Sequence, residues 1–118
     1  MLLDTGSSIS LIKHSALPKN ITLNRYHAKL SGIGQDLVTP LGSIVLPVRI
    51  QGQLFSTFFV VCPNSIELQF DGLLGFQFLQ KHQAQLCFMT NEITLNNLRF
   101  KLHVLNNYEV QLKRSTQL

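Results

Sequence analysis

Turn signals that recur at short intervals constrain this chain more than any other feature of its sequence. Glycine, proline and asparagine break the apolar segments about every 8–12 residues, which is the spacing of an all-β domain. The clearest unit is 44–50, where inward apolar positions alternate with Val45, Pro47 and Arg49. A second apolar run at 54–62 follows Gly52. The two runs predict a β-hairpin, and Pro47 indicates an edge strand.

The other segments extend this pattern along the chain. Short strands are expected at 1–3, 9–12, 73–74, 85–89, 92–95 and 100–105, a helical turn at 14–18, and a turn at Asn96-Asn97. One helix is expected at 76–83, because Phe78, Leu79 and His82 have helical spacing. About seven short strands with one short helix predict an all-β, single-domain, closed or partly open barrel.

Length and composition limit what this domain does. A chain of 118 residues holds one core and not two lobes, and 45% hydrophobic residues exclude disorder. No apolar run reaches the ~20 residues of a membrane helix, and the N-terminus lacks a signal peptide, so we expect an intracellular protein without a membrane partner. The net charge of +4 is mild and no basic stripe carries interleaved aromatics, so no direct nucleic-acid partner is expected.

The sulfur and imidazole side chains are sparse. Cys62 and Cys87 are expected to be free, buried thiols, with one disulfide as the alternative. The four histidines are scattered and no pair has i, i+4 spacing. We therefore expect neither a metal nor another cofactor.

One carboxylate is placed where chemistry can use it. Asp4 follows the apolar pair Leu2-Leu3 and precedes Gly6, so an apolar strand delivers it to a tight loop that the Thr5 hydroxyl can brace. The simplest alternative is an ordinary Asp-initiated turn. Two further features favour the catalytic interpretation, namely the glycine turn at 32–34 and the apolar, glycine-containing segment at 70–79.

Taken together, these motifs resemble the retropepsins, the single-domain aspartic proteases of retroviruses and long-terminal-repeat retrotransposons. The similarity is greatest to the gypsy-type retrotransposon branch. Leu2-Leu3-Asp4-Thr5-Gly6-Ser7 resembles the active-site loop, 32–42 the flap hairpin, and Asp71-Gly72-Leu73-Leu74-Gly75 the segment behind the active site. The resemblance covers residues 1–105, which we take as the protease domain with a truncated N-terminal strand, and leaves 106–118 as a polar tail or interface strand.

The resemblance implies an aspartic endopeptidase that works as a homodimer. Asp4 of each copy would meet its counterpart across a two-fold axis, and the two carboxylates would share one proton. One would activate a water and the other would hydrogen-bond the scissile carbonyl. Thr5 would bond across the dyad, Gly6 and Ser7 would support the loop, and the Ser7 hydroxyl is a candidate donor to the carboxylate. The substrate would be a retroelement polyprotein, cut in the cytoplasm or within a virus-like particle.

The flap and the substrate pockets are predicted with the same reasoning. The expected flap residues are Gly32, Ile33, Gly34, Gln35 and Asp36, with Gln35-Asp36 at the tip. A hairpin there would close over an extended peptide, whereas the alternative is an ordinary surface hairpin. The candidate pocket residues are Leu37, Val38 and Leu74, each equally suited to the core.

Two alternatives accompany this assignment. Asp71 lies in Asp-Gly-Leu-Leu-Gly and not in a second Asp-Thr-Gly, so we interpret it as a turn residue. The alternative function is a catalytically inactive or domesticated retropepsin-like module used for dimerisation or peptide binding. Retroviral members commonly pair an acid at the Ser8 position with an arginine at the Phe76 position, and both are absent here.

Overall fold

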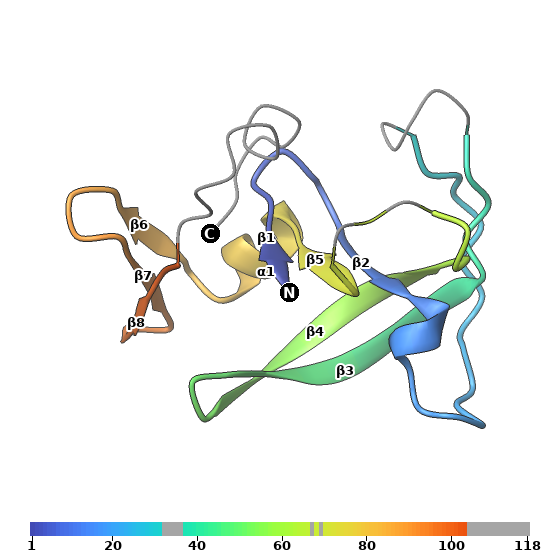
Figure 1. The fold of residues 1–118 in the computed structure, drawn as a ribbon, viewed down its shortest axis with the longest axis horizontal. Helices are drawn as coiled ribbons and strands as arrows, with labels where there is room; N and C mark the ends of the chain where they lie inside the picture. Colours follow the sequence, from blue (N-terminus) through green and yellow to red (C-terminus); the bar gives the residue numbers. More distant parts are fainter. Residues whose placement is uncertain (32–36, 67, 69, 104–118) are drawn as a thin grey trace.

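The computed structural model describes residues 1–31, 37–66, 68 and 70–103, and most of its regular structure is β-strand (Figure 1). A five-stranded sheet comprises, in spatial order, β1 (Leu2–Leu3), β5 (Gly72–Leu74), β2 (Ser10–Lys13), β4 (Gln53–Cys62) and β3 (Gly42–Ile50). A three-stranded sheet comprises β6 (Gln85–Cys87), β7 (Glu92–Leu95) and β8 (Leu98–Lys101). The helix α1 (Phe76–Lys81) connects the two sheets, and a single 3-10 turn, η1 (His14–Ala16), follows β2.

The five-stranded sheet brings together segments that are far apart in the sequence. β5 lies between β1 and β2, parallel to the first and antiparallel to the second, while β2 runs parallel to β4. The N-terminal strand therefore ends beside the strand that leads into α1. In Figure 1 the β1–β2 connection lies along the upper edge of the molecule and the β3–β4 hairpin along the lower edge.

The β3–β4 hairpin has the predicted form. Gln51 and Gly52 form its turn with positive φ values of 47° and 87°, which suits the twist of a two-residue hairpin. Pro47 has no N–H to donate, and β3 is an edge strand with one neighbour. Along β3 the inward positions change from buried at Ile44 to half-buried towards Ile50.

The five-stranded sheet is covered on both faces because alternate residues enter different clusters. One cluster joins Leu3, Ile12, Phe59 and Leu74 to side chains of α1 and the three-stranded sheet: Phe78, Leu79, Ile93, Leu95 and Phe100. The other contains Leu2, Leu11, Leu30, Val60, Cys62, Ile66, Leu68 and Leu73. Burial on both faces explains why these strands read as continuous apolar runs.

The predicted fold class is confirmed, with differences at element ends. The fold is all-β with one short helix, and its sheets stay open, with β1 and β3 as separate edges of the larger one. The helix ends at Lys81 because Gln83 has a left-handed φ of 50°. β8 begins at Leu98, directly after the Asn96-Asn97 turn, and ends earlier than expected. The predicted domain boundary at residue 105 lies outside the described residues.

The structure also bears on the expectations for the two cysteines and for membrane helices. Both cysteines are free, but only Cys62 is buried, so the expectation of two buried thiols is wrong for Cys87. Cys87 is the last residue of a three-residue strand whose two ends are exposed, which leaves the thiol uncovered. In the described part of the chain, no helix is long and apolar enough to cross a membrane.

Candidate active site

The structure places Asp4 at the end of a core strand. β1 pairs in parallel with β5 through Leu2 and Leu3, and the Asp4 N–H continues that ladder by donating to the Leu74 carbonyl at 2.9 Å. The Asp4 side chain is buried, with 8% of its surface exposed. A buried carboxylate requires hydrogen-bond donors, because desolvation without them is costly.

The loop after Asp4 supplies such a donor from its own backbone. The Gly6 N–H donates to Asp4 Oδ1 at 2.9 Å, and the Ser7 N–H donates to the Asp4 carbonyl at 3.2 Å. These two bonds wrap the chain into a tight turn around the carboxylate. The turn fixes the direction of the Asp4 side chain, as a catalytic group requires.

Ser7 supports the loop in a different way from the one expected. Its hydroxyl donates to the Ile9 carbonyl at 2.7 Å. A hydroxyl carries one hydrogen, so this bond takes the donor that the sequence suggested for the Asp4 carboxylate. Through this bond Ser7 holds the shape of the loop between Ser7 and Ile9.

Helix α1 holds the far side of the same loop. The Phe76 N–H donates to the Ser7 carbonyl at 2.7 Å, and the Gln77 N–H donates to the Ser8 carbonyl at 3.1 Å. These are N–H groups of the first helical turn, which have no partner inside the helix. The loop thus satisfies the helix start, and the helix start fixes the loop.

Gly75 and Ser10 complete this junction, and sequence reasoning did not single them out. A Cβ on Gly75 would lie 2.2 Å from the Ile9 carbonyl oxygen and 2.8 Å from that of Ser7. The Gly75 N–H donates to the buried Ser10 Oγ at 3.0 Å. The signal for Gly75 was its place in the glycine motif. The motif alone does not tell that the loop packs directly on this residue.

The predicted flap residues 32–36 lie outside the described residues. The segments on either side of them are joined by an antiparallel bridge between Leu30 and Val38, with reciprocal hydrogen bonds of 2.8 and 2.9 Å. This bridge joins the two described flanks, and the flap assignment of 32–36 stays a prediction.

The three pocket candidates have different environments. Leu37 is 64% exposed, Val38 packs against the cluster around Leu30, and Leu74 is buried in the core. Leu74 also lines an apolar groove of about 570 Å³ between the β3–β4 hairpin and the three-stranded sheet, whose described lining does not include Asp4. Leu74 therefore acts on the site through its carbonyl bond to Asp4, while its side chain belongs to the interior.

Asp71 and the possible metal ligands are the remaining candidates for the site. Asp71 is exposed before β5, and its carbonyl accepts from the Lys13 N–H at 2.8 Å, which fits a turn residue. Among the described residues, no three His, Cys, Asp or Glu side chains gather as a metal site would require.

An all-β domain that presents one Asp-Thr-Gly loop at the end of a core strand has the architecture of half an aspartic protease. The sequence model of the retroviral aspartyl protease family matches residues 1–87, and the chain belongs to that family. It is a retropepsin-like domain.

Two relatives illustrate how far the similarity extends. The chain is 26% identical over 108 residues to the retrovirus-related Pol polyprotein from transposon 412 of Drosophila melanogaster. The match covers 87% of this chain and 9% of the polyprotein. The crystal structure of the retroviral protease-like domain of Ddi1 from Leishmania major superimposes with a TM-score of 0.65 at 21% identity, covering 89% of this chain and 84% of that one. The second comparison supports the fold.

Proposed function

We propose that this chain is an aspartic endopeptidase that acts as a homodimer and processes a retroelement polyprotein between apolar residues, in the cytoplasm or within a virus-like particle. The observation that carries the proposal is the buried Asp4 carboxylate, held by the Gly6 N–H on a loop fixed by β5 and α1. One such loop per chain supplies one carboxylate. The family membership supports aspartic protease chemistry as the use of that group.

The mechanism needs two carboxylates in different protonation states. Across a two-fold axis, Asp4 and its copy would share one proton, because two adjacent negative charges are unfavourable. The ionised carboxylate takes a proton from a bound water, and the water oxygen attacks the scissile carbonyl carbon. The protonated carboxyl hydrogen-bonds the carbonyl oxygen. A proton then passes to the amide nitrogen, and the C–N bond breaks to release an acid and an amine.

The supporting parts follow from the same symmetry. Thr5, next to Asp4 and half-buried, would bond to its counterpart across the axis, so that one residue supports both loops. The 32–36 segment would cover an extended peptide, with Leu37 and Val38 at its base contributing to the pocket wall.

A cleavage assay at pH ~5 with apolar peptides, run beside sedimentation, tests the proposal. Asp4→Asn keeps the shape of the side chain and the oxygen that accepts from Gly6 but removes the acid. We expect cleavage to fall by at least about 100-fold with the dimer retained. The matched control is Asp71→Asn, an exposed change that should leave the rate unaltered.

Mixing the two forms tests whether each site uses two chains. If Asp4 from both copies is required, activity should fall with the square of the wild-type fraction as Asp4→Asn protein is added. A linear fall would assign the whole site to one chain. A stable dimer that cleaves no peptide would favour the inactive dimerisation or peptide-binding module, and cleavage by Asp4→Asn protein would refute the role of Asp4.

A further inference from the structure

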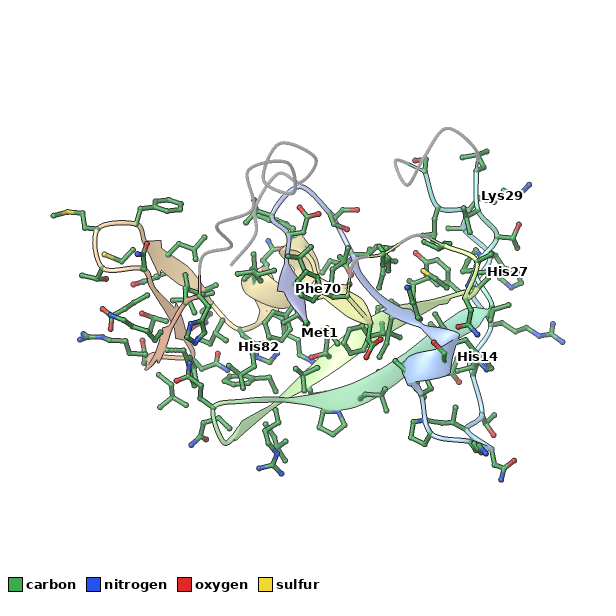
Figure 2. All side chains as sticks on the ribbon, in the orientation of Figure 1. Met1, His14, His27, Lys29, Phe70 and His82 are labelled. Atoms are coloured by element: carbon green, nitrogen blue, oxygen red, sulfur yellow. The ribbon has the colours of Figure 1, made fainter. Side chains whose placement is uncertain are left out.

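His82 is a buried polar side chain outside the Asp4 loop, and it caps the C-terminal end of α1. It is 6% exposed, and its backbone N–H donates to the Phe78 carbonyl at 3.1 Å. Figure 2 shows its position between the three-stranded sheet and the β3–β4 hairpin. Its ring lies against Phe78 and Phe55, with centroids 4.7 and 5.2 Å away. An imidazole in such surroundings must have both ring nitrogens satisfied.

Both nitrogens have partners, and the partners define the tautomer. Nε2 lies 3.0 Å from the Ser56 carbonyl of β4, which accepts only, so Nε2 carries the hydrogen. Nδ1 of the neutral ring is then an acceptor, and Asn96 Nδ2 donates to it at 3.1 Å. The assignment follows from the hydrogen-bond network. His82 thus joins α1 to β4 and to the β7–β8 turn.

Asn96 holds His82 by its backbone as well as by its side chain. The Asn96 N–H donates to the His82 carbonyl at 2.8 Å. Asn96 has a φ of 49° and Asn97 a φ of 68°, the two positive values of a tight hairpin turn. The geometry of the turn therefore presents Asn96 to the end of α1 with two hydrogen bonds.

The same helix carries the Asp4 loop at its other end. Phe76 and Gln77 donate to the Ser7 and Ser8 carbonyls, only one and a half turns before His82. We propose that His82 and Asn96 are positioning residues for the Asp4 carboxylate, acting through α1. This inference rests on the proposed function, and it makes the β7–β8 turn part of the machinery that holds the active-site loop.

The sharpest test changes Asn96 and leaves His82 in place, because removing His82 would also open a cavity among aromatic rings. Asn96→Gly deletes the bond to Nδ1 and keeps the backbone bond, and glycine accepts the positive φ. Asn97→Gly is the matched control, because it alters the same turn at a residue with no bond to His82 among the described contacts.

We expect Asn96→Gly to lower kcat by about 5- to 10-fold with KM changed less than about 2-fold, because a small displacement of a catalytic group reduces the chemical step. Asn97→Gly should change neither constant by more than about 2-fold. Thermal unfolding of both variants ensures that only folded protein is assayed. Equal kinetics for the two variants would overturn the positioning role.

A second readout separates this inference from the proposed function. Amide resonances of Gly6 and Ser7 report on the Asp4 loop whether or not any peptide is cleaved. Asn96→Gly should shift both resonances, and Asn97→Gly should leave them in place. The imidazole ¹⁵N spectrum of the parent protein should show His82 with hydrogen on Nε2. Unshifted loop resonances, or hydrogen on Nδ1, would overturn the inference even if the protein proves to be a protease.

Discussion

The two sheets of this molecule are built in opposite ways. Apart from the β3–β4 hairpin, the five-stranded sheet pairs distant segments, so that Ser10 lies beside Phe59 and Leu11 beside Leu73. The three-stranded sheet pairs only chain neighbours, as at Leu95 and Leu98. The candidate site belongs to the first kind of structure. The site forms only when the N-terminal loop that carries Asp4 packs against β5 and α1.

The sheets also differ in how they are covered. The five-stranded sheet has apolar clusters on both faces, whereas the three-stranded sheet buries one face, through Ile93, Leu95 and Phe100, and exposes the other. A small sheet of this kind depends on packing against a neighbour. The family match ends at Cys87, the last residue of β6, so the β7–β8 hairpin lies beyond it. The comparison predicts that damage to the first sheet disrupts the whole domain, while damage to the second loosens its attachment.

The largest effect is expected at the junction of loop, strand and helix. In Gly75→Ala, the new Cβ would meet the Ile9 carbonyl oxygen at 2.2 Å, so that backbone would have to shift to accommodate it. We expect the free energy of unfolding to fall by more than about 4 kcal/mol, or folding to fail, as measured by urea denaturation.

The matched control for Gly75→Ala is Gly52→Ala in the β3–β4 turn. Gly52 has open space around it and a φ of 87°, so alanine there meets only backbone strain of about 1 kcal/mol. If the two glycine variants proved equally stable, the close packing of the Asp4 loop on α1 would be disproved.

The contrast between the sheets also explains what could be predicted from sequence. Alternation and turn residues specify local structure, and the β3–β4 hairpin, the Pro47 edge and the Asn96-Asn97 turn follow from them. The Asp4 loop was found by its motif. The contact of Gly75 with Ile9 was not found, because it depends on how distant segments meet. The bond from Ser7 to Ile9 is local, but the motif does not specify which acceptor the hydroxyl takes. Leu74 was a pocket candidate because it is apolar, yet its carbonyl is the group that touches Asp4.

The next effect concerns the attachment of the three-stranded sheet. Phe100 is 5% exposed and its ring meets Phe55 edge-on at 5.7 Å. Phe100→Ala should lower the free energy of unfolding by about 3 kcal/mol, because it leaves a cavity between the sheets. Leu98→Ala, on the same strand but 44% exposed, should cost less than about 1 kcal/mol. Equal losses in the two variants would show that the sheet is not docked through Phe100.

The smallest effect is expected at the two thiols, one in each sheet, which should differ in their reactivity. Burial raises the pKa of Cys62 in β4 from 9.0 to about 11. The pKa of Cys87 in β6 is lowered, mainly by a hydrogen bond from the Thr90 side chain and next by one from the Thr90 backbone. Iodoacetamide at neutral pH should therefore label Cys87 at least about 100-fold faster than Cys62, because the thiolate is the reactive form. Mass spectrometry of single-thiol variants measures the two rates, and equal rates would contradict the buried placement of β4.

The Cys62 thiol also predicts a dependence of stability on pH. In the unfolded chain the thiol ionises near pH 9.0, whereas in the folded protein it stays protonated until about pH 11. Between these values the folded state binds more protons than the unfolded state, so the free energy of unfolding falls as pH rises. The contribution is complete below pH 9 and lost as pH rises through the folded pKa.

Urea denaturation at several pH values should show this slope in the parent protein and a smaller slope in Cys62→Ala. Cys87→Ser should not flatten the slope, because the lowered pKa of Cys87 in the folded protein makes that thiol favour folding as pH rises, so that its removal steepens the fall. A slope that follows Cys87 and not Cys62 would reverse the assignment of interior and surface between the two sheets.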